Sequence, residues 1–497
     1  MTAVALSLSS SRENANMQES SKNGKSPKRR KKSVPSGFSL GGAAKEMHGH
    51  PIYCIKWSTD LYEIETVVSP TEEEGSTVAT NSSSSTLTEI KDVSSSSSTT
   101  TSAAPTYCHC FATCAGNHVT IYEDTPNGIN IRQVYKDVDD DEMFYICAFG
   151  GHGIGSAVDC GPTSSYNIKD GTTTILLPTK SKHDNDESSE ETTTSTNIFQ
   201  LLADLKYYDG PQLLCVAGKR GVIKIIDTCR RALLLTLSGH GDEIYDLKFS
   251  PTNPWLLVSA SKDESLRLWN VQTATCVAIF AGHNAHRDSV LYISWHPSGK
   301  KFASCGMDTS VKVWSVTEST IQNAIEKSYS YNTISKRGSQ QNQDKDESCK
   351  KTSCAAFPTL YEQIPIFSTN QMHTDYVDCV QFIGDLLISK STTNLLALWK
   401  TGTKNGVIPL RDFPLTNCDV WFVRFHTDPL CQMLAIGNTK GEIKIWEIDH
   451  FAKKKAFVSL THSTCTSTIR MVSFSPDGKT LLACCDDSSV WKWNANP

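Results

Sequence analysis

GHGDEIYDLKFSPTNPWLLVSASKDESLRLWN, residues 239–270, is the stretch that decides the fold. It holds three short apolar runs separated by turns rich in Gly, Pro, Asn, Asp and Ser. The first run ends on Phe249, and the last ends on Trp269 followed by a polar residue. Short runs bounded by such turns indicate β-strands joined in antiparallel succession. This stretch therefore predicts a small sheet of short strands.

The same arrangement recurs along the chain, and each unit ends on an aromatic or aliphatic residue followed by a polar one. The seven closing pairs are Tyr122-Glu123, Ile226-Asp227, Trp269-Asn270, Trp314-Ser315, Trp399-Lys400, Trp446-Glu447 and Trp493-Asn494. Where no insertion intervenes, successive pairs lie 43, 45, 47 and 47 residues apart. A WD40 blade has roughly 40–45 residues. The sequence therefore predicts an all-β chain, a seven-bladed WD40 β-propeller.

Low-complexity segments interrupt this pattern, as in SSSSSTTTS at 94–102. Such segments bury too little apolar surface to offset the entropy of ordering them. We expect residues 1–36 to be a disordered basic tail and residues 37–497 to be the propeller. Its low-complexity loop insertions are expected at about 62–104, 151–209 and 325–360. The last Trp pair stands almost at the end of the chain, so we expect residues 37–47 to supply the outer strand that closes the ring, which limits exposed sheet edges.

Four histidines recur at a similar place in their blades, 26 to 31 residues before the closing Trp: His240, His286, His373 and His462. Asp263, Asp308 and Asp487 each stand six residues before theirs. A buried histidine needs partners for both ring nitrogens, and a turn aspartate can supply one. We interpret these residues as structural hydrogen-bonding groups, with the other four blades degenerate at the aspartate.

The distribution of charge and cysteine bears on location. The chain has 497 residues and a net charge of −5, but KNGKSPKRRKK (22–32) is strongly basic and is typical of a nuclear-import signal. No apolar run is long enough to span a bilayer, so no membrane association is expected. Cysteines within apolar runs fit a reduced, intracellular location. Cys108, Cys110 and Cys114 lack a His/Cys pair at zinc spacing, so no metal or other cofactor is expected.

The innermost strands of a propeller line its central channel. When the first strand of each unit is aligned on its final aromatic, the residue four places earlier shares one register. These residues are Tyr53, Tyr145, Tyr245, Leu291, Asp378, Trp421 and Arg470. Four aromatics thus face the channel near the acidic stretch DVDDDE (137–142). Aromatic faces among negative charges suit a cation, above all a quaternary ammonium. Simple packing of these rings is the alternative.

Several stretches resemble the embryonic ectoderm development family, the WD40 subunits of Polycomb repressive complex 2. They include DEMFY (141–145), LWNVQTATCVAIF (268–280) and CDVWFVRF (418–425). The resemblance spans about 45–494 and skips the insertions. It implies a non-catalytic, nuclear protein that reads trimethylated lysine 27 of histone H3 and activates a SET-domain histone methyltransferase held on its other face. The implied partners are that methyltransferase, other Polycomb subunits and the histone H3 tail, with no small-molecule substrate.

Residue by residue, the resemblance implies a trimethyl-lysine cage of Phe111, Tyr145, Trp421 and Phe422. Tyr53 and Tyr245 are not cage positions in the family, and we interpret them as packing or rim residues. Phe422 departs from the family, which usually has Tyr there. Arg424 matches the family motif and is a possible peptide contact, although a structural role facing the channel fits equally well. The alternative function is a general WD40 adaptor, such as a ubiquitin-ligase substrate receptor. Catalysis is not expected, because no nucleophile–base motif, HExxH or Walker A loop is present.

Overall fold

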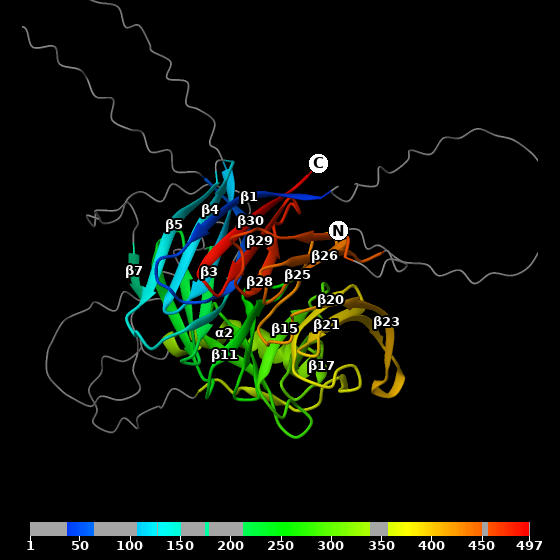
Figure 1. Cartoon of the computed structure of the whole chain (residues 1–497). Coiled ribbons are helices and arrows are strands. Elements are labelled where there is room, and N and C mark those ends of the chain that lie inside the picture. Colours follow the sequence, from blue (N-terminus) through cyan, green and yellow to red (C-terminus); the bar gives the residue numbers. More distant parts are fainter. Residues whose placement is uncertain are drawn as a thin grey trace, which may run out of the picture. The chain divides into compact units, whose positions relative to one another are not determined.

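Seven separate β-sheets make up the folded part of the chain. The computed structural model describes residues 37–63, 107–126, 128–150, 174–177, 212–337, 356–449 and 456–496. All of them belong to one compact unit, Ser36–Pro497. Each sheet is built on four strands that pair antiparallel from the channel outward (Figure 1), and the seven-bladed WD40 propeller expected from the repeats is confirmed.

The first four blades run from residue 52 to residue 369. The first contains β2 (Ile52–Glu63), β3 (Tyr107–Ala115), β4 (His118–Thr125), β5 (Gly128–Asp137) and β7 (Thr174–Leu177). The second contains β6 (Phe144–Gly150), β8 (Leu213–Gly218), β9 (Val222–Asp227) and β10 (Ala232–Ser238). The third contains β11 (Ile244–Phe249), β12 (Leu256–Ser261), β13 (Leu266–Asn270), β14 (Thr275–Phe280) and β18 (Leu360–Glu362). The fourth contains β15 (Val290–Trp295), β16 (Lys301–Gly306), β17 (Val311–Ser315) and β19 (Phe367–Thr369).

The last three blades complete the ring. The fifth contains β20 (Val377–Ile383), β21 (Leu386–Ser391), β22 (Leu395–Thr401) and β23 (Val407–Pro414), with the 3-10 turn η2 (Thr403–Asn405) between its last two strands. The sixth contains β24 (His426–Thr427), β25 (Met433–Gly437), β26 (Ile443–Glu447) and β27 (Val458–Leu460). The seventh contains β28 (Ile469–Phe474), β29 (Thr480–Cys485), β30 (Ser489–Ala495) and β1 (Phe38–Lys45).

The ring closes by pairing the two ends of the folded unit. β1 lies antiparallel to β30 from Phe38 opposite Ala495 to Lys45 opposite Ser489 (Figure 1). The expectation that residues 37–47 supply the outer strand is therefore confirmed. This pairing covers the edge of β30, which would otherwise present unpaired backbone groups to solvent.

Two blades carry a complete chain of buried hydrogen bonds from His to Trp. In the third blade Trp269 Nε1 donates to Ser259 Oγ at 2.8 Å, and that hydroxyl bonds His240 Nε2 at 2.7 Å. The other ring nitrogen of His240 lies 2.8 Å from Asp263. His286, Ser304, Asp308 and Trp314 repeat the arrangement in the fourth blade. The structural role expected for these histidines is confirmed in both blades.

The fifth and seventh blades depart from this arrangement. His373 binds Ser389, which also accepts from Trp399, but Thr393 stands where the aspartate would be. His373 Nδ1 therefore has no hydrogen-bond partner among the residues that the structure describes. In the seventh blade the expectation for His462 is wrong: its Nδ1 bonds Thr464 and does not reach Asp487. β29 has Ala483 where the third blade has its serine, so no hydroxyl is available to join the two ends.

Acidification is expected to destabilise the fold through His373. Burial, followed by the positive charge of Lys390, lowers the pKa of His373 to about 4. The unfolded chain takes up this proton near pH 6.5, whereas the folded chain takes it up only near pH 4. Stability is therefore lost as pH falls through this window, by about 1.4 kcal/mol per pH unit for this residue. Denaturant titrations at pH 7 and pH 5 measure this loss of unfolding free energy. An equally steep loss in His373→Gln would show that His373 is not its cause.

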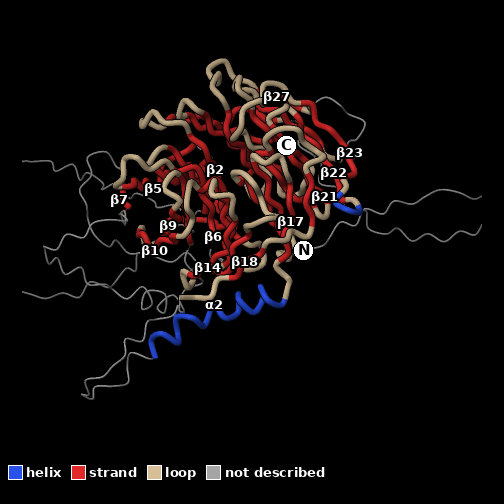
Figure 2. The backbone as a smooth tube through the Cα atoms, turned by 90° about the horizontal axis from the view of Figure 1, so that it is seen from below, coloured by secondary structure: helices blue, strands red, loops and turns tan. Residues whose placement is uncertain are grey.

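The first part of the 325–360 segment is helical. The helix α2 (Ser319–Arg337) continues through its first part and packs along β14 (Figure 2). Ile321, Ala324, Ile325 and Ser328 are buried, because they recur at the three- and four-residue spacing of one helix face. The expectation of a loop insertion is therefore wrong for residues 325–337. The 151–209 insertion likewise contributes β7, parallel to β5; the basic tail and residues 64–104 lie outside the described residues.

Among the described residues, no helix is both long and apolar enough to cross a membrane. Within the same ranges, no three His, Cys, Asp or Glu side chains gather closely enough to hold a metal ion. Cys110 and Cys114 are buried on β3 as free thiols.

Candidate functional site

Five aromatic side chains, together termed the aromatic cluster, meet at one mouth of the channel. They are Tyr53, Tyr145, Tyr245, Trp421 and Phe422. The three tyrosines stand at the start of the innermost strands β2, β6 and β11, and the other two precede β24. Ring centroids in contact lie 5.4 to 6.3 Å apart. Most pairs meet edge to face, the geometry that the aromatic quadrupole favours.

Phe422 is the centre of the aromatic cluster, and its ring contacts the other four. Its side chain is only 4% exposed, and its backbone has a φ of +66°. A bulky residue rarely adopts this left-handed conformation, and the strain is of order 1–3 kcal/mol. The next two amides hold the segment in place: Val423 N–H donates to Asp378, and Arg424 N–H donates to the carbonyl of Arg470.

The same geometry explains why the sixth blade lacks a full inner strand. The alignment predicts a strand through VWFVRF, but β24 covers only His426–Thr427. The amides of Val423 and Arg424 bond the fifth and seventh blades rather than their own. The left-handed turn at Phe422 thereby directs two successive aromatic rings to the channel mouth.

Trp421 is the exposed edge of the aromatic cluster. Its side chain is 38% exposed, while Tyr53 and Tyr145 are half-buried. Arg470 donates to the carbonyl of Trp421 at 3.1 Å and is held by a bidentate ion pair with Asp486. Trp421, Tyr53 and Tyr145 are therefore the rings of the cluster that keep part of their surface exposed.

Negative charge lies next to these faces. The Tyr245 hydroxyl donates to Glu243 at 3.1 Å. Burial, followed by the charge of Glu243, raises the pKa of both Tyr145 and Tyr245 above the usual value, so both phenols are neutral. A carboxylate beside neutral aromatic rings favours a bound cation over an anion.

The DVDDDE stretch contributes less free charge than its composition suggests. Asp137 is fully buried and paired with Lys224, and Asp139 pairs with Arg220 at 2.5 Å. Glu142 is also buried and accepts hydrogen bonds from the amides of Met143 and Arg220. Most of this stretch therefore fixes the loop, and Glu243 supplies the carboxylate nearest to the rings.

Phe111 does not join the aromatic cluster. It stands on β3 opposite Trp57, four residues along β2 from Tyr53, a separation of about 13 Å along a strand. Its ring is fully buried between Trp57 and Tyr122, with a centroid distance of 4.9 Å to Tyr122. The structure thus brings together Tyr145, Trp421 and Phe422, and it puts Tyr53 where Phe111 was expected. The channel register contained that signal, because Tyr53 shares it with Tyr145.

Arg424 lies beneath the aromatic cluster inside the channel. It is fully buried, and its Cζ lies 4.1 Å from the Phe422 ring centroid. Its Nη2 donates to the carbonyls of Tyr245 and Leu291 at 2.7 and 3.1 Å. Of the two roles open to Arg424, the structural one facing the channel fits this geometry, since it supports Phe422 from the side away from solvent.

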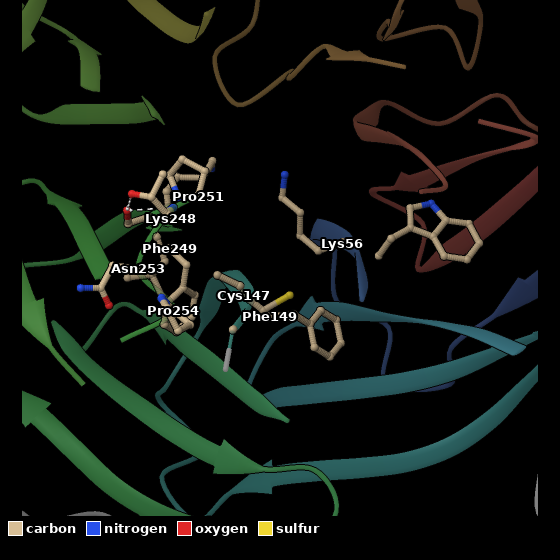
Figure 3. Close-up of a pocket in the computed structure, with 14 residues that line it drawn as sticks. Lys56, Cys147, Phe149, Lys248, Phe249, Pro251, Asn253 and Pro254 are labelled. Carbon is tan, nitrogen blue, oxygen red and sulfur yellow. Dashed lines mark hydrogen bonds between the residues drawn. The ribbon is translucent and has the colours of Figure 1, made fainter. Parts of the chain in front are cut away.

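A pocket of about 410 Å³ lies at the opposite ends of β2, β6 and β11. Its lining includes Lys56, Phe149 and Lys248, together with the loop from Phe249 to Pro254 (Figure 3). The aromatic cluster uses the first residues of these strands, and the pocket uses the last ones. The propeller therefore has a distinct candidate surface at each end of its channel.

Fold and channel together define the class: a WD40-repeat β-propeller with an aromatic candidate site at one mouth. The WD domain, G-beta repeat model matches residues 231–270, 274–315 and 456–494. Polycomb group protein FIE2 of Zea mays is 33% identical over 78% of this chain and 84% of its own length. Polycomb protein esc of Drosophila melanogaster is 33% identical over 77% of each. The chain belongs to this family of Polycomb group WD40 proteins, the embryonic ectoderm development family.

Solved structures support the fold at a greater evolutionary distance. A chain of Chaetomium thermophilum Polycomb Repressive Complex 2 bound to GSK126 matches with a TM-score of 0.58 at 16% identity, covering 92% of this chain and 98% of that one. A chain from a structure of the same fungal complex with H3K27me3 and H3K27M matches with a TM-score of 0.56, also at 16% identity. At this identity, the likeness concerns the propeller alone.

Proposed function

We propose that this protein is a non-catalytic propeller subunit of a nuclear Polycomb repressive complex 2. In this proposal the aromatic cluster reads trimethylated lysine 27 of histone H3. The opposite end of the propeller holds the SET-domain methyltransferase, and reading the mark activates that enzyme. The observation that carries the proposal is the convergence of Tyr53, Tyr145, Trp421 and Phe422 beside Glu243 at one channel mouth.

The chemistry of the cluster fits a trimethyl-ammonium headgroup. Such a group donates no hydrogen bond and has an apolar skin, so it loses little on leaving water and gains from π-faces. A desolvated contact with Trp or Tyr contributes on the order of 2 kcal/mol. An unmethylated ammonium would leave three N–H donors unpaired against the rings, which costs free energy. The site should therefore discriminate by methylation state.

Family membership supports the assembly part of the proposal. The related plant and insect proteins are Polycomb group proteins, and the structural neighbours are chains of Polycomb Repressive Complex 2. One of those neighbours was solved with H3K27me3. A single channel with different surfaces at its two ends allows a peptide and a protein subunit to bind together. Activation additionally requires that the mark bind more tightly to the active state of the complex.

Titration of the full chain with histone H3 peptides centred on lysine 27 of the histone tests the reading function. We expect the trimethyl peptide to bind about tenfold or more tightly than the unmethylated one, because each lost cation–π contact costs on the order of 1–2 kcal/mol. A peptide carrying the neutral tert-butyl analogue of trimethyl-lysine is the matched control, since it keeps the shape and removes the charge. It should also bind about tenfold or more weakly than the trimethyl peptide.

Equal affinity for trimethylated and unmethylated peptides would overturn the reading function and leave a general WD40 adaptor. Equal affinity for the trimethyl peptide and its neutral analogue would replace the cation–π mechanism by apolar burial. Co-purification with the SET-domain methyltransferase from the same cells tests the assembly separately. Failure of the pair to co-purify would overturn the assembly part alone.

A further inference from the structure

A second group of channel residues, below the aromatic cluster, carries positive charge. The residue just before the final aromatic of each inner strand shares one register. These residues are Lys56, Ala148, Lys248, Ser294, Gln381, Arg424 and Ser473. Three of the seven are cationic and none is acidic. The seven blades therefore place three positive charges at one level of the channel.

The carboxylate beside this level cannot neutralise all three cations. Asp246 is fully buried and bonds Lys248 Nζ at 2.6 Å with both oxygens. It also accepts from the amide of Ile293 at 2.9 Å and lies 3.8 Å from Arg424 Nη1. The next carboxylate, Asp378, pairs with a lysine of its own, Lys390, at 2.9 Å. The group therefore has four positive and two negative charges. The cations are Lys56, Lys248, Lys390 and Arg424, and the anions are Asp246 and Asp378.

Two of the cations have unused hydrogen-bond donors. Arg424 is fully buried, yet its Nε and Nη1 have no hydrogen-bond partner among the described residues. Lys56 Nζ makes neither an ion pair nor a hydrogen bond within the same part of the structure; Figure 3 shows its side chain among the residues that line the pocket. Unused donors on a buried guanidinium are costly, and the Lys56 ammonium has no carboxylate partner there, so this group of cations favours an incoming anion.

Neighbouring titratable groups show the effect of this excess charge. Burial, together with the charges of Lys56 and Arg424 and against the opposing charge of Asp246, lowers the pKa of Lys248 to about 8. Burial, with Lys56 and Lys248, lowers the pKa of His426 to about 3, so this imidazole is neutral and adds no charge. The positive potential therefore comes from the three channel cations.

Two of these cations line the pocket of about 410 Å³ at the end of the channel away from the aromatic cluster. Lys56 and Lys248 belong to its lining, while Phe249, Pro251 and Pro254 form apolar walls (Figure 3). Apolar walls strengthen the attraction between a bound ion and the lysines, because they lower the local dielectric. The space admits a phosphate or a pyrophosphate.

We propose that this end of the channel is a binding site for a small phosphate-type anion, held by Lys56 and Lys248 and attracted by Arg424. A divalent or more highly charged anion matches the excess of two positive charges. This site is separate from the aromatic cluster and does not depend on the reading function.

The test is calorimetric titration of the full chain with inorganic phosphate and with pyrophosphate, at low ionic strength and pH 7. Lys56→Gln removes a cation that has no acidic partner among the described residues, so it leaves no carboxylate there unpaired. The matched control is Lys300→Gln, a change at an exposed lysine outside the channel. We expect Lys56→Gln to weaken pyrophosphate binding by about tenfold to a hundredfold, as for loss of a charged hydrogen bond. Lys300→Gln should bind as the wild type does.

Two results would overturn the site: no heat of binding for either anion with the wild type, or equal loss in Lys56→Gln and Lys300→Gln. Acetate is the third probe. Equal affinity for acetate and pyrophosphate would contradict a site for multivalent phosphate and point to a carboxylate side chain of a partner instead. Trp421→Ala should bind pyrophosphate normally, so failure of the reading function and failure of this site are distinguishable.

Discussion

Replacing Trp421 by alanine is expected to weaken binding of the trimethylated histone H3 peptide by about 30-fold or more. Trp421 is the most exposed ring of the aromatic cluster and has the largest π-face, and its cation–π contact contributes on the order of 2 kcal/mol. Fluorescence or calorimetric titration measures the change. Binding of the unmethylated peptide should change far less, because it gains little from the ring.

Tyr376→Ala is the matched control for Trp421→Ala. Tyr376 is also an exposed aromatic, 40% exposed against 38% for Trp421, but it makes no ring contact with the aromatic cluster among the described residues. Wild-type affinity is expected for this control. Unchanged affinity of Trp421→Ala would remove the aromatic cluster from the reading function, whereas equal losses for both peptides would assign Trp421 to the peptide backbone.

Most of the fold was predictable, because each blade encodes its own strands and turns. The repeat spacing fixes the number of blades, and the pairing of β1 with β30 agrees with the outer strand expected from residues 37–47. The helix α2 was missed because its polar Ser, Gln, Asn and Lys residues resemble a linker by composition. Only its Ile321, Ala324, Ile325 and Ser328 spacing contained the helical signal.

The sequence predicted at which level of the channel the candidate site lies, but not all the residues that form it. Alternation along a strand tells which residues face the channel, and on that basis Tyr53, Tyr145 and Trp421 fall at one level. The left-handed backbone of Phe422 could not be predicted from the sequence. Such a conformation is rare for a bulky residue, so a phenylalanine in VWFVRF gives no sign of it. Phe111 was expected in the cage, but on β3 it pairs with Trp57, four residues along β2 from Tyr53.

Phe111→Ala is expected to lower the free energy of unfolding by about 3–5 kcal/mol, because it empties a fully buried aromatic site between Trp57 and Tyr122. Tyr53→Ala removes a half-buried ring and should cost less stability, about 1 kcal/mol. Its trimethyl-peptide affinity should instead fall by about tenfold or more. Denaturant unfolding and peptide titration of both variants separate the two roles.

Phe111→Leu completes this comparison, because it keeps most of the apolar volume and should remain folded at about 1–3 kcal/mol below the wild type. If Phe111 only packs the first blade, this variant binds the trimethyl peptide with wild-type affinity. A folded Phe111→Leu that loses the peptide, together with a Tyr53→Ala that keeps it, would restore Phe111 to the site. The opposite pattern is expected, since Tyr53 contacts Tyr145 and Phe422 directly while Phe111 contacts neither.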